Sequence, residues 1–579
     1  MPAGFIELTL VIVVATVLGI LARLARQPTV LAYLFAGVLI GYFNFFNVAD
    51  RETFQVFADL GIMFLLFLVG LEVNYRSLKL VGWGSAMIGL IQIVVSVAAG
   101  YILARFFGYS PLVSSYIAAA VSFSSTIITV KILSDKGDLN SLYGKIAIGV
   151  LLFQDVCAVL ILVVLTGFAP LVLEGAGSGF GLATKVAQTL IGGILLFVVA
   201  FYASKNVVPR FFQFIARSPE LLFLASLAWV FLFASITGLL GFPVAIGGLL
   251  AGITLANSYE HFQIANRVRP LRDFFLLIFF AILGSSVVLS SFTGIVGTIV
   301  VFSALVLIGK PIIVFFASSL MGYRKRPSFL SGIALGQISE FSLILAAAGY
   351  QLGHLSSDVV ALITAVGIVT ITVSTYIETG GESLYARLNP YISFFERGGI
   401  RDVRSESTPR GSIVLIGFHR TGRSIADALG VRSDLLVIDF DPEAVGVLKE
   451  RGIAFVFGDM TDPDIIERAY LRNAKLVIST SPDIESNVML LHALKRREGT
   501  GDLARGVPRI ITRARTDHEA EALYEAGADY VLLPHAAAGE YLGHSITHDP
   551  ELRFIDKARR GTGVAPAKKP NLSPRGSYF

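Results

Sequence analysis

Long apolar runs separated by short polar breaks fill the first two thirds of the chain. Runs of about 20 apolar residues have the length of a helix that crosses a bilayer, and the sequence contains thirteen candidates. They lie near residues 5–25, 29–46, 54–73, 82–107, 111–133, 142–168, 183–208, 219–240, 242–257, 271–289, 293–322, 328–352 and 357–379. The pattern therefore predicts a polytopic α-helical membrane protein with a membrane domain over residues 1–380.

The pattern changes after a polar linker that we place at 381–410. Short β-branched strands then alternate with helical stretches, beginning with GSIVLIGFHRTGRSIADAL and DLLVIDFD. This alternation is typical of a doubly wound parallel sheet, so we predict an α/β Rossmann-like domain over 411–545. The basic tail, 546–579, is rich in Gly and Pro and is predicted to be disordered.

Composition agrees with a membrane protein. Apolar residues make up 54% of the 579 residues and charged residues only 15%. The single Cys157 excludes an internal disulfide framework. The first span has neither a basic segment before it nor a small-residue cleavage site after it, so it is not expected to be a signal peptide.

The loop charges predict the orientation. With the N-terminus outside, sixteen Lys and Arg residues fall in loops on the cytoplasmic side and three in loops on the other side. Cytoplasmic loops carry the excess of Lys and Arg. The thirteen spans therefore predict a multi-pass protein of a bacterial-type inner membrane with its C-terminal domain in the cytoplasm.

Three ionisable residues lie near the centres of separate predicted spans: Asp155, Lys310 and Glu340. Each costs about 2.5–3.5 kcal/mol at mid-helix on the insertion scale, which favours a shared internal polar site. The alternative is a buried ion-pair network that only fixes helix register. A carboxylate at this depth can hold a proton or a desolvated monovalent cation but not both, and Gln154 offers a second oxygen beside Asp155. Access to it from each side in turn would be antiport.

Hydroxyl residues in the span near 111–133 suggest an unwound helix. Ser122, Ser124, Ser125 and Thr126 can replace backbone hydrogen bonds, and free carbonyls would then face the site. Small hydroxyl residues also serve ordinary helix packing. GQISEFS, however, has the matching place in a second five-span block, and paired interruptions indicate an inverted-repeat transporter.

Ordered motifs over nearly all of 1–380 resemble the monovalent cation:proton antiporter-2 family, and its Kef-type potassium/proton antiporters in particular. The motifs are FADLGIMFLLFLVGLEV, SFSSTIITVKIL, FQD, RPLRDFFLLIFFAILGSS, GKP and GQISEF. The resemblance implies a thirteen-helix, inverted-repeat (NhaA/NapA-like) fold with a dimerisation domain and a moving core. It makes Asp155 the carrier of cation and proton and Gln154 its neighbour. It places Ser124, Ser125 and Thr126 on the first broken helix and Gln337 and Glu340 on the second, and makes Lys310 the stabilising basic residue.

The Gln–Asp pair at 154–155 resembles the Kef-like branch, which implies potassium as the transported cation. A sodium/proton antiporter of the same fold is the alternative. A nucleotide-gated potassium channel would need a filter loop of the TVGYG type, which the sequence lacks. A membrane-anchored enzyme would need neither thirteen spans nor charges at mid-depth, so we expect a transporter.

The cytoplasmic part resembles the nucleotide-binding half of the regulator-of-potassium-conductance (RCK N-terminal, TrkA-N) domains, through FGDMTDPDIIERA, STSPDIESN and AGADYVLLP. The resemblance puts a nucleotide's phosphates on one turn, its ribose on Asp439, and its adenine near Asp459, Met460 and Thr480. The phosphate-binding residues would be Gly417, Phe418, His419, Arg420, Thr421 and Gly422.

His419 stands where a second glycine usually lets backbone approach a pyrophosphate, which favours AMP, ADP or ATP over NAD(H). A Rossmann-like module that binds nothing is the alternative. We further expect a homodimer through both domains, a lipid bilayer as environment, and no nucleic acid. Regulation by glutathione or a soluble subunit stays open.

Overall fold

The chain forms two compact units, Met1–Ile400 and Arg401–Phe579. The structure is a computed structural model in which a defined set of residues is described. These are 3–43, 51–72, 75–167, 198, 200, 202–215, 218–240, 243–256, 258, 260–285, 292–392, 413–430, 434–460, 465–466, 469, 471–495 and 508–549. Most of the predicted span 183–208, the linker after residue 392 and the tail after residue 549 lie outside them.

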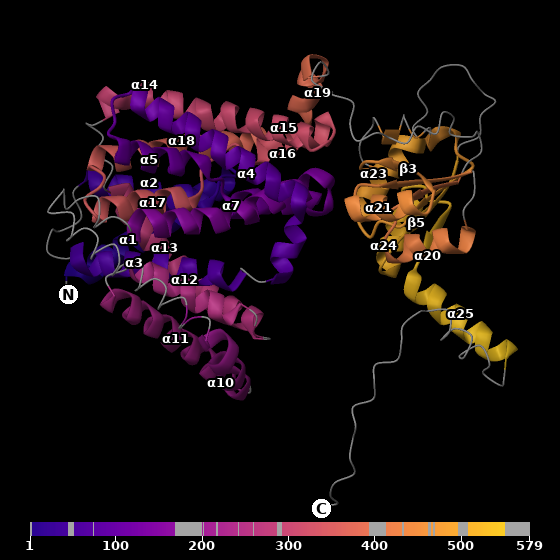
Figure 1. Ribbon diagram of the computed structural model, residues 1–579, viewed down its shortest axis with the longest axis horizontal. Coiled ribbons are helices and arrows are strands. Elements are labelled where there is room, and N and C mark those ends of the chain that lie inside the picture. The colour runs from indigo at the N-terminus through magenta and orange to yellow at the C-terminus, as the bar shows by residue number, and fades with distance from the viewer. Residues whose placement is uncertain are drawn as a thin grey trace, which may run out of the picture. The chain divides into compact units, whose positions relative to one another are not determined.

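The first unit is helical (Figure 1). Its first half contains α1 (Ala3–Leu24), α2 (Thr29–Tyr42), α3 (Arg51–Glu72), α4 (Tyr75–Phe106), α5 (Pro111–Ser122), α6 (Thr126–Asp135), the 3₁₀ turn η2 (Asp138–Asn140) and α7 (Leu142–Gly167). Its second half contains the π-turn η3 (Ala203–Val207), α10 (Val208–Ile215), α11 (Pro219–Leu239), α12 (Val244–Leu255), α13 (His261–Ser285), α14 (Phe292–Ala304), the π-turn η5 (Leu305–Gly309), α15 (Lys310–Leu320), α16 (Lys325–Ala334), α17 (Glu340–Gln351), α18 (Ser357–Thr379) and α19 (Gly381–Ile392). The last of these, α19, makes the first part of the expected linker helical.

Eight segments among the described residues are long and apolar enough to cross a membrane. Four further predicted spans correspond to helices that are too short or too polar to meet this criterion of length and apolar composition. Helices α2 and α12 are short, α13 carries several charges in its first half, and the predicted span 328–352 is divided between α16 and α17. The number thirteen itself stays a prediction.

Helices of the first unit gather into two bundles. Helices α2, α3, α11, α12 and α13 pack on one another, while α4, α5, α7, α15, α16, α17 and α18 form a second group. Glycine permits the closest approaches: a Cβ added at Gly252 of α12 would lie 2.1 Å from the carbonyl oxygen of Phe67 on α3. Such close backbone contact is a usual way for helices to associate in membranes.

Two spans are broken in the middle, where the sequence predicts interruptions. Helix α5 ends at Ser122 and α6 begins at Thr126, and the backbone at Phe123 and Ser125 between them is extended. Helix α16 ends at Ala334 and α17 begins at Glu340. We call residues 123–125 the first break and 335–339 the second break. Both are buried within the second bundle.

The second unit is a parallel sheet flanked by helices. Its strands are β1 (Ile413–Ile416), β2 (Leu435–Asp439), β3 (Ala454–Phe457), β4 (Leu476–Ser479), β5 (Arg509–Arg513) and β6 (Tyr530–Leu532). Its helices include α20 (Arg420–Leu429), α21 (Pro442–Glu450), α23 (Ile484–Lys495), α24 (Asp517–Glu525) and α25 (Pro534–His548). The strand order β3-β2-β1-β4-β5-β6, with every pairing parallel, is the predicted doubly wound arrangement.

Candidate functional site

The residues predicted for the membrane site meet around the first break. Thr126 Oγ1 donates a hydrogen bond to Asp155 Oδ2 at 2.9 Å, and Ser125 Oγ donates to Glu340 Oε1 at 2.9 Å. Asp155 lies at the centre of α7, a 26-residue helix, and is half-buried. The break thus presents hydroxyl groups to two carboxylates on two other helices.

Lys310 joins the two breaks. Its fully buried Nζ donates to the carbonyl oxygen of Phe123 at 2.8 Å and to that of Gln337 at 2.7 Å. Lys310 follows directly after the short π-helix η5, and such local widenings of a helix are frequent at functional sites. The ammonium group therefore binds backbone carbonyls that regular helices would have used internally.

Hydroxyl and amide side chains complete the contact between the breaks. Ser124 Oγ donates to Leu335 O at 2.9 Å, and Thr129 Oγ1 donates to Ala334 O at 2.8 Å. Gln337 Nε2 donates to Thr129 Oγ1 at 3.0 Å, and Ser342 Oγ donates to Ala120 O. The segments around each break therefore supply hydrogen-bond donors to polar groups around the other break.

Gln154, which the sequence predicts as a second oxygen ligand beside Asp155, has protein partners for both its oxygen and its nitrogen. Its Oε1 accepts a hydrogen bond from Ser124 N at 3.0 Å, and its Nε2 donates to Oε1 of Gln92. Gln92, on α4, is fully buried and was missed by sequence reasoning. Its signal was a lone amide in the apolar run GLIQIVVSV, at the middle of a predicted span.

In the second unit the predicted phosphate-binding turn follows β1. Gly417 has φ +87°, a conformation that favours glycine. A Cβ on Gly422 would lie 1.9 Å from Gly417 O, so glycine lets α20 start directly against the strand. His419 precedes the helix but makes no capping bond, and its Nε2 lies 3.0 Å from Asp441 Oδ2.

Asp439 ends β2 at the edge where this turn lies. Its Oδ2 accepts from Phe418 N at 2.5 Å and its Oδ1 from Asp441 N at 2.8 Å, so the carboxylate holds the turn in shape. Thr480 Oγ1 lies 3.0 Å from the carbonyl oxygens of both Ile416 and Gly417. The carboxyl ends of β1 and β4, where the strand order reverses, thus meet at the position where such sheets bind ligands.

The remaining predicted residues of this unit divide between surface and core. His419 and Arg420 are exposed and Thr421 is half-buried at the helix start. Asp459 and Met460 are buried, and Met460 packs in the apolar core with its Sδ 3.6 Å from Ser479 Oγ.

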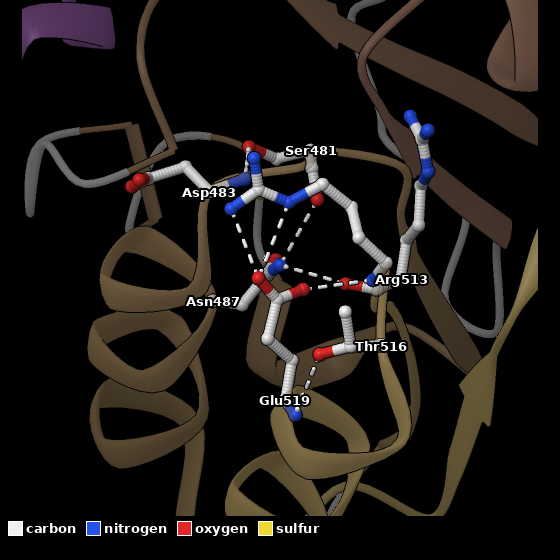
Figure 2. Close-up of polar contacts among 7 residues, drawn as sticks. Ser481, Asp483, Asn487, Arg513, Thr516 and Glu519 are labelled. Atoms are coloured by element: carbon white, nitrogen blue, oxygen red, sulfur yellow. Dashed lines mark hydrogen bonds and ion pairs between the residues drawn. The ribbon is translucent and has the colours of Figure 1, made fainter.

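A further polar network connects the loops that follow β4 and β5 (Figure 2). Asn487 Nδ2 donates to Ser481 O at 3.0 Å and lies 3.4 Å from Arg513 O. Thr516 Oγ1 caps α24 by accepting from Glu519 N at 3.3 Å. Hydrogen bonds from the backbone and the guanidinium of Arg515 lower the pKa of Glu519.

Comparisons with known proteins cover both units. Residues 11–378 match the family described as sodium/hydrogen exchanger, transmembrane, and residues 413–534 match the TrkA-N domain. A protein of Escherichia coli named as a cation/proton antiporter, YbaL, is 29% identical over 537 residues, covering 90% of this chain and 93% of that protein. The glutathione-regulated potassium-efflux system protein KefC of Salmonella schwarzengrund is 26% identical over 471 residues, covering 81% and 74%. The crystal structure of the TrkA-N domain of the Escherichia coli inner membrane protein ybaL is 26% identical, with a TM-score of 0.21, and covers 24% of this chain and 98% of that one.

Proposed function

The chain belongs to the sodium/hydrogen exchanger family, and from this premise we propose that it is a secondary active antiporter that exchanges a monovalent cation for protons by alternating access. The observation that carries the proposal is the contact of Asp155 with Thr126 at a broken helix inside the membrane unit. A carboxylate at this depth is costly to leave charged, and either a proton or a bound cation neutralises it. Asp155 is therefore suited to hold either a proton or a desolvated cation.

We propose separate roles for the other residues of this cluster. Thr126 positions the Asp155 carboxylate, while Ser124 and Ser125 hold the first break against Leu335 and Glu340. Lys310 and Gln337 keep the two breaks together through the buried contacts of Lys310 Nζ and Gln337 Nε2. In this scheme Gln154 orders the backbone and is not a cation ligand.

We propose potassium as the cation, on the strength of the Gln154–Asp155 pair and the similarity to KefC. Exchange of one proton for one cation is electroneutral if Asp155 is the only group that changes its partner. The second bundle would move against the first as the core of alternating access, within a homodimer whose C-terminal unit lies in the cytoplasm.

We propose that an adenine nucleotide regulates the exchange from the second unit. The first-turn amides of α20 would bind the phosphates, and Asp439 would take the ribose after exchanging its bond to Phe418 N. A nucleotide can shift the transport equilibrium only by binding one conformation better than the other. Isothermal calorimetry of the full chain with AMP, ATP and NADH tests this part, and no heat with any of them contradicts it.

The test of transport uses purified full-length protein in proteoliposomes with a pH-sensitive dye. Pulses of K⁺, Na⁺, Li⁺ or Rb⁺ should drive proton movement in the wild type, with K⁺ effective at the lowest concentration. Asp155→Asn should abolish it, because an amide can neither take up a proton nor neutralise a cation. The matched control is Asp273→Asn, the same change at a 59% exposed side chain on α13, which should leave exchange intact. Exchange that survives in Asp155→Asn would place the site elsewhere, and a wild type without exchange would refute the function.

A further inference from the structure

Two glutamines form a bridge across the first break. Gln92 Nε2 donates to the carbonyl oxygen of Ser122 at 3.0 Å and to Ser96 Oγ at 2.9 Å, and its Oε1 accepts from Gln154 Nε2. Gln154 Oε1 in turn accepts from Ser124 N at 3.0 Å. The bridge therefore starts at the last carbonyl of α5, passes through both side chains, and returns to the chain two residues later.

This bridge replaces hydrogen bonds that the break removes. A helix that stops inside a membrane leaves polar backbone groups without water, and each unsatisfied group costs several kcal/mol. Here Ser122 O is bound by α4, Phe123 O by α15 and Ser124 N by α7, through Gln92, Lys310 and Gln154. The backbone of the break is thereby held from three sides.

A glutamine is the side chain that suits position 92. The buried amide uses both Nε2 hydrogens and its oxygen. A glutamate has no donor when ionised and a single donor when protonated, so it could not donate to both Ser122 O and Ser96 Oγ. An asparagine is one methylene shorter. A methionine fills a similar volume but forms none of these hydrogen bonds.

Residues of the bridge are adjacent in the chain to residues of the candidate cation site. Gln154 immediately precedes Asp155 on α7, and Ser124 stands two residues before Thr126. The Gln154–Ser124 and Asp155–Thr126 hydrogen bonds are thus two neighbouring contacts between the same two segments. Loss of the Gln154–Ser124 hydrogen bond is therefore expected to change the geometry of the Asp155–Thr126 contact.

We propose that Gln92 is a positioning residue for cation exchange, which acts through Gln154 on the backbone of Ser122–Ser124 and so fixes where Thr126 meets Asp155. The inference rests on the proposed function. Both Nε2 hydrogens and Oε1 of Gln92 have protein partners, so we assign Gln92 a positioning role and not that of a cation ligand. Its loss should therefore weaken cation binding more than it slows the exchange step.

The test measures exchange kinetics of the full chain in proteoliposomes. Gln92→Met should raise the KM for K⁺ by about tenfold or more, since misplacement of a reacting group by about 1 Å costs up to about 100-fold, while kcat falls by a smaller factor. The matched control is Gln263→Met, the same change at an exposed side chain of α13, with KM and kcat unchanged. A folded Gln92→Met variant whose KM stays within twofold of the wild type overturns the inference.

Two further measurements separate positioning from a general loss of structure. If Gln92 acts through Gln154, the Gln92→Met/Gln154→Met double variant should raise KM no more than the stronger single variant, whereas independent sites would multiply their effects. If Gln92→Met does not fold, Gln92→Asn decides instead: it keeps the amide one methylene short and should raise KM, and an unchanged KM contradicts the inference. Exchange by the wild type together with an unaffected Gln92 variant rejects this inference alone and leaves the proposed function standing.

Discussion

Three helices begin within the candidate sites: α6 and α17 in the membrane unit and α20 in the second unit. Their first turns differ in how the backbone N–H groups are bound. In the membrane unit Ser125 Oγ caps α6 by accepting from Ile128 N at 3.3 Å, and Ser339 Oγ caps α17 by accepting from Phe341 N at 3.2 Å. In the second unit α20 begins after His419, whose side chain makes no capping bond. Of these three helices, α6 and α17 have side-chain caps and α20 starts without one.

The difference follows from the solvent that each turn meets. A helix start without a cap leaves N–H groups that attract anions. In a membrane the protein must supply the partners itself, because unsatisfied backbone groups are too costly there. A turn at the edge of the sheet in the second unit can leave the same groups to water or to a phosphate. Capped starts therefore suit a site for cations and protons, and the uncapped start suits a nucleotide.

Lys310→Met should have the largest effect on stability, because Lys310 Nζ serves both breaks. The variant leaves Phe123 O and Gln337 O without this donor. At roughly 1–3 kcal/mol for each unpaired buried carbonyl, the free energy of unfolding should fall by about 2–6 kcal/mol, less the relief of no longer burying an ammonium. Denaturation of the detergent-solubilised full chain measures this.

The control for Lys310→Met is Lys131→Met, the same change at an exposed lysine of α6. It should leave the unfolding midpoint unchanged. Equal stability of both variants would mean that the broken helices do not depend on side-chain donors. That result would contradict the view that the membrane unit must supply side-chain partners for its free backbone groups.

Gly422→Ala should have the next largest effect, now in the second unit. The added Cβ would lie 1.9 Å from Gly417 O, so α20 must move away from the turn and its first amides with it. Nucleotide affinity of the full chain, measured by calorimetry, should fall at least about tenfold, which is 1.4 kcal/mol.

Gly446→Ala is the matched control, because an added Cβ there would meet no atom within 4 Å. It should bind nucleotide like the wild type. If Gly422→Ala binds equally well, the phosphates do not lie at the start of α20.

Much of this contrast could be predicted from the sequence, because its main signals are local. Apolar runs predict spans, and alternating strands and helices predict all six strands of the sheet. Asp155 and Lys310 stand out because ionisable residues are rare at mid-membrane. The hydroxyl residues Ser124–Thr126 indicate a break because their side chains can replace backbone hydrogen bonds.

Partners far apart in the chain could not be predicted. Nothing local tells that Gln92 binds Ser122, or that Lys310 binds carbonyl oxygens of both breaks. Helix ends were also displaced: α13 begins at His261, although the apolar run begins near 271. The first half of α13 carries three arginines and Pro270, and this polar composition predicts a loop. A helix that leaves the membrane can, however, continue with polar residues.

Glu519→Gln should have the smallest effect, because its partner is exposed. Arg515 holds Glu519 through Nη2 at 2.9 Å and through the backbone N at 2.8 Å, and its side chain is 61% exposed (Figure 2 shows Glu519 beside Thr516). The pKa of Glu519 is lowered by these bonds, so their stabilisation is present above the unfolded pKa of about 4.3 and is lost as pH falls through the folded pKa. An exposed pair contributes less than about 1 kcal/mol.

Thermal melts of the full chain at pH 7 and at pH 4 check this prediction. Glu519→Gln should lower the melting temperature of the second unit slightly at pH 7, and the difference should shrink at pH 4. Glu521→Gln, at an exposed position of the same helix, controls for the change of net charge and should show no such pH dependence. A loss of stability as large as that of Lys310→Met would contradict the comparison. Water at the exposed surface of the second unit can replace a lost hydrogen-bond partner, whereas the interior of the membrane unit offers no such replacement.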